Sequence, residues 1–141
     1  MKILFVCTGN TCRSPMAEII LKQKLKEAEI KHIEVFSAGV CCVNGQDMTD
    51  KSGVALEKLG YNFSSHKSTD INTLKLNEYQ IYTMTEGHKS GVNAPCQSAS
   101  DITGLDISDP WMKSQEVYDK CAKQIENFCD EIIQQILTGE M

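Results

Sequence analysis

The chain has 141 residues, of which 41% are hydrophobic and 23% charged, and this is the size and composition of one ordinary globular domain. Its 19 acidic and 14 basic residues give a formal net charge of −5, which argues against nucleic acid or an anionic membrane as a partner. No apolar run approaches the roughly 18 residues of a membrane span, and residues 1–6 lack the anatomy of a cleavable signal. The sequence therefore predicts a cytoplasmic protein.

The chain opens with the pattern of a strand, a tight loop and a helix. Residues 3–6 are continuously apolar and partly β-branched, which is typical of a short buried strand in a parallel sheet. Residues 7–13 are polar. Ser14 followed by Pro15 then predicts a helix start, with Ser14 as the N-cap and Pro15 in the first turn.

A second strand and a second helix follow. Residues 33–36 predict the strand, which Ser37, Ala38 and Gly39 end. Residues 49–59 predict the helix, with Gly60 as its C-cap. Its expected buried face consists of four apolar side chains: Val54, Ala55, Leu56 and Leu59. A short helix near residues 73–76 is also expected.

The last third of the chain ends in the clearest element. Residues 79–84 predict a third strand, residues 85–100 a short helix and a loop, and residues 101–113 a weak strand. Residues 114–137 predict a long helix, because apolar side chains recur at a 3.6-residue period: Val117, Cys121, Ile125, Phe128, Ile132 and Ile136. Alternating strands and helices predict an α/β fold, a parallel sheet with helices on both faces, in one domain over residues 1–141.

The cysteines and histidines give no sign of a metal centre or a cofactor. The cysteine count is odd, at seven, and most of them are interpreted as small buried hydrophobes of a reducing compartment. Cys41 and Cys42 form an adjacent pair, but no second pair stands at zinc spacing. His32, His66 and His88 are not at ligand spacing and are interpreted as surface or packing residues.

The arginine count singles out one position. Of the 14 basic residues all are lysine except Arg13. Lysine cannot replace a planar guanidinium in bidentate recognition of a phosphate or carboxylate group. Arg13 is therefore the first candidate for a functional residue.

The loop between the first strand and the first helix has the pattern of a phosphate site. Cys7 and Arg13 bracket five residues, and loop amides beside a helix N-terminus converge on one point that favours an anion. Gly9 is expected to let the backbone turn tightly there. Arg13 would add a fixed positive charge and two parallel hydrogen bonds.

The positive electrostatic potential expected at this loop also predicts covalent catalysis. A thiol at a helix N-terminus beside an arginine loses its proton readily, so Cys7 is expected to be a thiolate that attacks phosphorus and forms a phosphocysteine. Ser14 could donate a hydrogen bond to this sulfur, and Asn10 could hold the loop in shape. The leaving group also needs a proton, and Asp109, in the rigid sequence Asp109-Pro110-Trp111, is the candidate acid.

Residues 6–18, VCTGNTCRSPMAE, resemble the signature of the low-molecular-weight protein tyrosine phosphatase family, and Asp109-Pro110 resembles its general-acid loop. The resemblance implies a four-stranded parallel sheet with helices on both faces. It implies a phosphorylated protein as substrate, inorganic phosphate as product and no cofactor. It implies Cys7 as nucleophile, Arg13 as phosphate clamp and Asp109 as general acid. The other residues expected at the substrate site are Thr8, Gly9, Asn10, Thr11, Cys12, Ser14 and Trp111.

Position 11 bears on the substrate. Tyrosine-specific members of the family usually carry isoleucine there, whereas Thr11 resembles the bacterial protein-arginine phosphatase branch. A small polar wall suits a polar leaving group, so phosphoarginine is the predicted substrate and phosphotyrosine the alternative. Trp111 could stack on either side chain and does not decide between them.

Cys12 and the remaining cysteines leave further alternatives. In the family a second cysteine at this position can form a reversible disulfide with the catalytic one, so Cys12 is a candidate redox residue. Arsenate reduction on the same scaffold is a more distant alternative, because it needs a relay of cysteines and only Cys96 lies near the usual place. A non-catalytic phosphate-binding module is disfavoured, because Cys7, Arg13 and Asp109 are all present.

Overall fold

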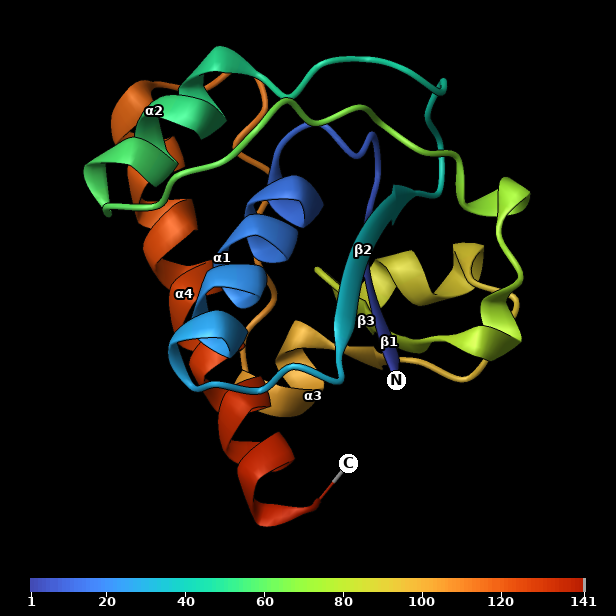
Figure 1. Cartoon of the computed structure of the whole chain (residues 1–141). Helices are drawn as coiled ribbons and strands as arrows, with labels where there is room; N and C mark the ends of the chain where they lie inside the picture. The colour runs from blue at the N-terminus through green and yellow to red at the C-terminus, as the bar shows by residue number, and fades with distance from the viewer. Residues whose placement is uncertain (141) are drawn as a thin grey trace.

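Four strands form one parallel sheet at the centre of the computed structural model, which describes residues 1–140 (Figure 1). They are β1 (Lys2–Cys7), β2 (Glu34–Gly39), β3 (Gln80–Thr83) and β4 (Gln97–Ser98). Their order is β2-β1-β3-β4, and every pairing is parallel. The predicted α/β fold with a four-stranded parallel sheet is confirmed.

Helices cover both faces of the sheet, as predicted. The α-helices are α1 (Arg13–Glu27), α2 (Asp50–Lys58), α3 (Ala99–Thr103) and α4 (Gln115–Thr138). In Figure 1, α1, α2 and α4 gather on one side of the strands. Three short 3₁₀ helices belong to the other side and its loops: η1 (Ile71–Thr73), η2 (Leu76–Glu78) and η3 (Glu86–Gly91). No helix within residues 1–140 is long and apolar enough to cross a membrane.

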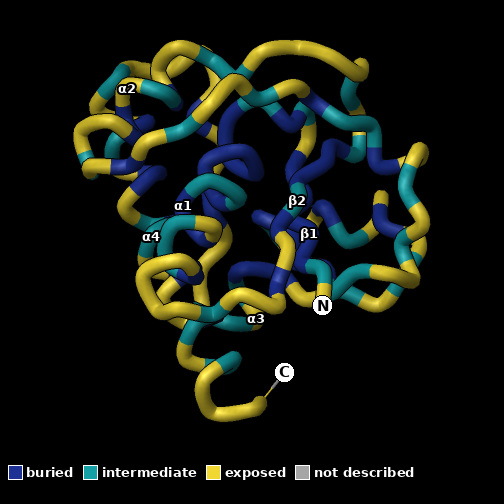
Figure 2. The backbone as a smooth tube through the Cα atoms, in the orientation of Figure 1, coloured by how far each residue is buried: buried dark blue, intermediate teal, exposed yellow. Residues whose placement is uncertain are grey.

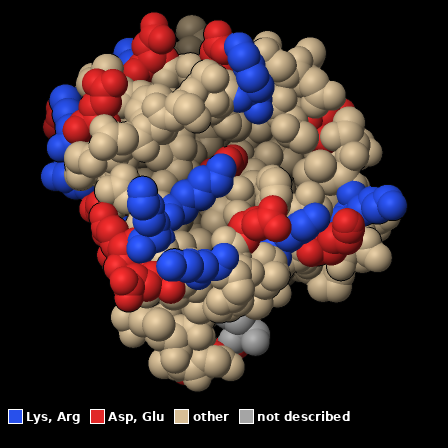
Figure 3. Space-filling model, in the orientation of Figure 1, with Lys and Arg blue, Asp and Glu red and all other residues tan. Residues whose placement is uncertain are grey.

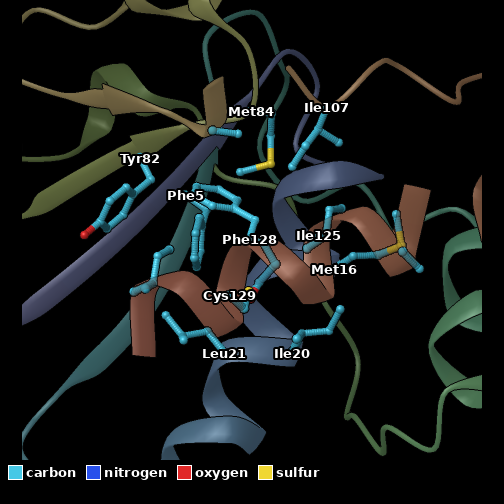
Figure 4. Close-up of a cluster of buried hydrophobic side chains, with 14 of the residues drawn as sticks. Phe5, Met16, Ile20, Leu21, Tyr82, Met84, Ile107, Ile125, Phe128 and Cys129 are labelled. Carbon is cyan, nitrogen blue, oxygen red and sulfur yellow. The ribbon is translucent and has the colours of Figure 1, made fainter. Parts of the chain in front are cut away.

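The alternation of side chains along β1 divides the core in two. Ile3 and Phe5 face α1 and α4, while Leu4 and Val6 face the opposite side, and all four are fully buried. Figure 2 shows β1 as buried along the centre of the molecule. On the larger side the Phe5 and Phe128 rings meet edge to face, with centroids 5.9 Å apart (Figure 4). A strand packed on both faces gives the loop that follows it a rigid base.

The prediction of one strand and the predicted burial of two valine side chains are wrong. The weak strand expected within residues 101–113 is absent, and the last strand lies earlier, at β4. Ser98 Oγ accepts from the Asp101 backbone N–H while the Asp101 carboxylate accepts from the Ser98 N–H, and this capping box starts α3 instead. In α2, Val54 is exposed, because the short helix turns Ser52, Ala55 and Leu56 inward. Val117, in the first turn of α4, is also partly exposed.

Arg13 differs from surface lysines such as Lys22 and Lys58 in how far it is exposed to solvent. Figure 3 shows basic and acidic side chains next to one another on the face in view, and lysines form exposed ion pairs such as Lys22 with Glu18 at 2.6 Å and Lys58 with Asp119 at 2.7 Å. Such pairs contribute little to stability. Arg13 is only 4% exposed. Its guanidinium group is therefore largely shielded from bulk solvent.

Candidate active site

The loop between β1 and α1 lies at the carboxyl edge of the sheet, where the chain changes direction. β2 pairs with one side of β1 and β3 with the other, so the helices and loops that follow diverge from this point. In parallel α/β sheets such a switch point opens a crevice that holds ligands. The predicted phosphate loop stands at this switch point.

The loop turns its carbonyl groups outward. Four of its carbonyl oxygens accept hydrogen bonds from other segments at 2.9–3.0 Å: Cys7 O from Val40 N, Thr8 O from Cys41 N, Asn10 O from His66 Nε2, and Thr11 O from Thr49 N. In a trans peptide the N–H points opposite to the C=O. The amide groups of the loop therefore face its inner side, which makes a nest for an anion beside the N-terminus of α1.

Asn10 makes the turn that was expected at Gly9. Its φ is +56°, in the left-handed region that asparagine tolerates better than most residues, whereas Gly9 has no positive φ. The Asn10 side chain fixes this geometry, because Nδ2 donates to Ser14 Oγ at 2.8 Å and Oδ1 accepts from the Thr69 N–H at 2.9 Å. Asn10 thus holds the loop in shape from behind.

Ser14 does not cap α1. The helix begins at Arg13 with Cys12 as N-cap, and Ser14 lies in the first turn, fully buried. Its Oγ is 2.8 Å from Cys7 Sγ and 3.5 Å from the Ala38 carbonyl. Because Oγ already accepts from Asn10, its one hydrogen is left to donate either to the Ala38 carbonyl or to Cys7 Sγ, and Cys7 Sγ is the nearer acceptor. Tertiary contacts with the loop have replaced the capping role that local sequence favours.

Arg13 connects the loop to the segment before α4. Its Nη1 donates to the Ile107 carbonyl at 2.9 Å, and its Nη2 lies 3.7 Å from Asp109 Oδ2. The Asp109 side chain is about half exposed, with a relative accessibility of 52%. Its Oδ1 accepts from the Trp111 N–H at 3.0 Å, which folds residues 109–111 into a turn. A buried guanidinium and an accessible carboxyl thus lie side by side.

A cleft of about 460 Å³ opens in front of the loop. Eight of the predicted site residues line it: Cys7, Thr8, Gly9, Thr11, Cys12, Arg13, Asp109 and Trp111. Asn10 and Ser14 are not among the lining residues and support the loop from behind. A larger hollow of about 710 Å³ lies between α1 and residues 62–66, but neither Cys7 nor Arg13 lines it. The predicted site residues therefore gather at the smaller cleft.

Five residues at or beside the loop were not predicted from the sequence. Gln46, Asp47 and Thr49 complete the wall of the cleft from the segment before α2. His66 binds the Asn10 carbonyl, and His88 Nε2 lies 2.9 Å from Thr8 Oγ1. His66 and His88 therefore contact the loop directly, whereas His32 is an exposed surface residue, as predicted. Of these residues, His66 stands in the sequence His66-Lys67-Ser68, which weakly resembles a stretch of the phosphatase family named above.

All seven cysteines are free, and the Cys12 thiol contacts two hydroxyl groups. Cys12 is buried, with Sγ 3.4 Å from Tyr118 Oη and 3.6 Å from Thr49 Oγ1. Burial and the hydrogen bond to Cys12 raise the pKa of Tyr118 to about 12, so this phenol is neutral and acts in packing. Burial also raises the pKa of Cys121 to about 12, which agrees with its predicted place on the buried stripe of α4.

The model of the low molecular weight phosphotyrosine protein phosphatase family matches residues 2–140. The chain belongs to this family. As a low molecular weight phosphatase it is a cysteine-dependent enzyme, which confirms the resemblance seen in residues 6–18.

Relatives of this low molecular weight phosphatase carry different names. A protein-arginine-phosphatase of Geobacillus stearothermophilus is 31% identical, over 99% of this chain and 98% of its own. The PtpB protein-tyrosine-phosphatase of Staphylococcus epidermidis is 32% identical, over 94% and 96%. An arsenate reductase of Staphylococcus aureus is 32% identical, over 89% and 94%. The solved YwlE arginine phosphatase from G. stearothermophilus is 30% identical and has a TM-score of 0.84, over 99% of this chain and 94% of that one.

Proposed function

We propose that this low molecular weight phosphatase removes phosphate from phosphoarginine side chains of proteins. The observation that carries the proposal is the wall of the cleft, to which Thr11, Gln46, Asp47 and Thr49 contribute polar groups and Trp111 the aromatic one. An aryl ring gains most from apolar contact, whereas a guanidinium gains from oxygen acceptors. The arginine phosphatase of G. stearothermophilus, similar over nearly the full length, supports the same substrate class.

The reaction we propose has two steps, and Cys7 carries the phosphoryl group between them. In the first, the Cys7 thiolate attacks phosphorus, the P–N bond breaks and Asp109 gives its proton to the leaving nitrogen. In the second, the Asp109 carboxylate takes a proton from water, the water oxygen bonds to phosphorus, and the S–P bond breaks to release inorganic phosphate. Arg13 and the loop amides hold the phosphoryl oxygens in both steps. Ser14, at 2.8 Å, donates to the departing sulfur.

Phosphotyrosine is the alternative substrate, and it would use the same two steps. Trp111 is compatible with it, because its exposed ring at the mouth of the cleft could stack on a phenyl group as well as on a guanidinium. Arsenate reduction has less support. Cys96 packs against the smaller core, and burial raises the pKa of its thiol, which weakens it as a relay nucleophile. A thiol-dependent arsenate assay separates that activity from hydrolysis.

Replacing Thr11 with isoleucine tests the substrate. The wild-type enzyme is expected to prefer a phosphoarginine protein to a phosphotyrosine peptide in kcat/KM. Thr11→Ile is expected to shift the ratio toward phosphotyrosine by about tenfold or more, because an apolar wall replaces a hydroxyl. The matched control is Thr138→Ile, at the exposed end of α4. A wild-type preference for phosphotyrosine would keep the mechanism and overturn the substrate.

Asp109→Asn tests the general acid. The amide cannot donate a proton to the leaving group, so kcat is expected to fall by about 10²–10⁴-fold on phosphoarginine. The loss on p-nitrophenyl phosphate is expected to be much smaller, because p-nitrophenolate leaves without protonation. Asp106→Asn is the matched control, since its side chain accepts from the Glu86 N–H at 2.9 Å and an amide oxygen can do the same. Equal losses on both substrates would exclude Asp109 as the acid.

A further inference from the structure

His88 forms a buried connection between β3 and the start of the phosphate loop. It lies in η3 and is only 9% exposed, and its Nε2 is 2.9 Å from the hydroxyl of Thr8, the residue after Cys7. On its other edge Nδ1 accepts from the Thr85 N–H at 3.1 Å and lies 3.0 Å from Thr85 Oγ1. Both ring nitrogens are therefore engaged.

These contacts assign the tautomer of the ring. A backbone N–H can only donate, so His88 Nδ1 carries no proton, and in a neutral imidazole the proton is on Nε2. Nε2–H then donates to Thr8 Oγ1, which acts as acceptor. The hydroxyl hydrogen of Thr8 is left free for a partner in the cleft, which Thr8 lines.

The surroundings of His88 keep the ring neutral. Arg13 faces it from α1, Asp106 and Asp109 face it from the segment before α4, and on its own helix Lys89 pairs with Glu86 and with Asp101 of α3. Burial and the positive charge of Arg13 lower the pKa of His88 to about 4, although the two carboxylates act in the opposite direction. The neutral tautomer is thus the form present around pH 7.

We propose that His88 is a positioning residue that turns the Thr8 hydroxyl into a hydrogen-bond donor for a phosphoryl oxygen bound above Cys7. The inference rests on the proposed function of this cleft. Thr8 is held at two points, because its carbonyl also accepts from the Cys41 N–H at 3.0 Å. An imidazole with the other tautomer would accept from Thr8 and take that hydrogen away from the cleft.

A double-mutant cycle with inorganic phosphate as the probe tests this role. Thr8→Val removes the hydroxyl. His88→Asn keeps an acceptor where Nδ1 stands but has nothing at the place of Nε2. Each change is expected to weaken phosphate binding by about tenfold in calorimetry, the loss typical of one hydrogen bond, and the double variant is expected to be no weaker than either. His88→Gln, whose amide nitrogen reaches the place of Nε2, is expected to restore most of the affinity.

A spectroscopic measurement checks the tautomer without any turnover. The ¹⁵N shifts of the His88 ring are expected to show a protonated Nε2 and an unprotonated Nδ1 at pH 7, and no cationic ring until the pH nears 4. A proton on Nδ1, or additive losses in the cycle, would overturn the inference. A wild-type enzyme that binds phosphate but hydrolyses neither phosphoarginine protein nor p-nitrophenyl phosphate would instead overturn the proposed function, while the role of His88 in phosphate binding would stand.

Discussion

Lysine in place of Arg13 is expected to lower kcat/KM by about 10³-fold on every phosphorylated substrate. The guanidinium has enough donors to bind the Ile107 carbonyl at 2.9 Å, lie 3.7 Å from Asp109 and still present a fork to phosphate. A lysine ammonium is a single point of charge at the end of a flexible stem. It can donate to the Ile107 carbonyl or to the phosphate but not to both. The segment that contains Ile107 and Asp109 and the phosphate loop are then no longer connected by one side chain.

The measurement compares Arg13→Lys with Lys24→Arg, which exchanges the same two residue types on the same helix. Lys24 pairs with Asp130 at 2.5 Å and does not line the cleft, so Lys24→Arg is expected to leave kcat/KM unchanged. Thermal unfolding of both variants shows whether the fold survives. If a folded Arg13→Lys enzyme kept more than about a tenth of the wild-type kcat/KM, the bidentate role of Arg13 would be wrong.

The sequence predicted the parts of the fold and of the site that depend on nearby residues. The apolar run of β1 and the stripe of α4 each specify an element without knowledge of the rest of the chain. The phosphate loop is equally local, because its amides, its helix N-terminus, Cys7 and Arg13 lie within one strand–loop–helix unit. Local sequence alone would present Asp109 as an ordinary turn residue, and it became the candidate acid because the chemistry of the phosphate loop requires a proton donor; the family resemblance agrees with that choice.

The parts that could not be predicted depend on contacts between distant segments. Thr8 meets His88 across 80 positions of sequence, and Arg13 meets Ile107 across 94. Gln46 and Asp47 reach the cleft only because the segment before α2 folds over it. No periodicity or spacing in one sequence encodes such pairs.

The same contacts explain why a sound local rule failed at Ser14. Serine before proline is a good N-cap, yet here the side chain is turned toward Asn10 and Cys7 and leaves the helix end uncapped. The amides that an N-cap would have satisfied are those that an anion can bind. A departure from a local preference therefore coincides with the candidate active site.

Serine in place of Cys7 is expected to reduce turnover by more than about 10⁵-fold while phosphate still binds. A serine hydroxyl keeps its proton at neutral pH, and within residues 1–140 the side chain that contacts Cys7 Sγ is the Ser14 hydroxyl at 2.8 Å, which is not a general base. The loop amides and Arg13 are untouched by the exchange. The affinity for inorganic phosphate, measured by calorimetry, is thus expected to stay within about threefold of wild type.

Cys96→Ser is the matched control, because Cys96 is a half-buried thiol that does not line the cleft. It is expected to leave kcat/KM and phosphate affinity unchanged. The two measurements on Cys7→Ser separate chemistry from binding: lost turnover with retained phosphate affinity identifies position 7 as the nucleophile. Retained turnover would show that another group attacks phosphorus. Loss of phosphate affinity together with turnover would show instead that the thiol is needed to form the anion nest, and the covalent step would then need trapping of a phosphocysteine to be established.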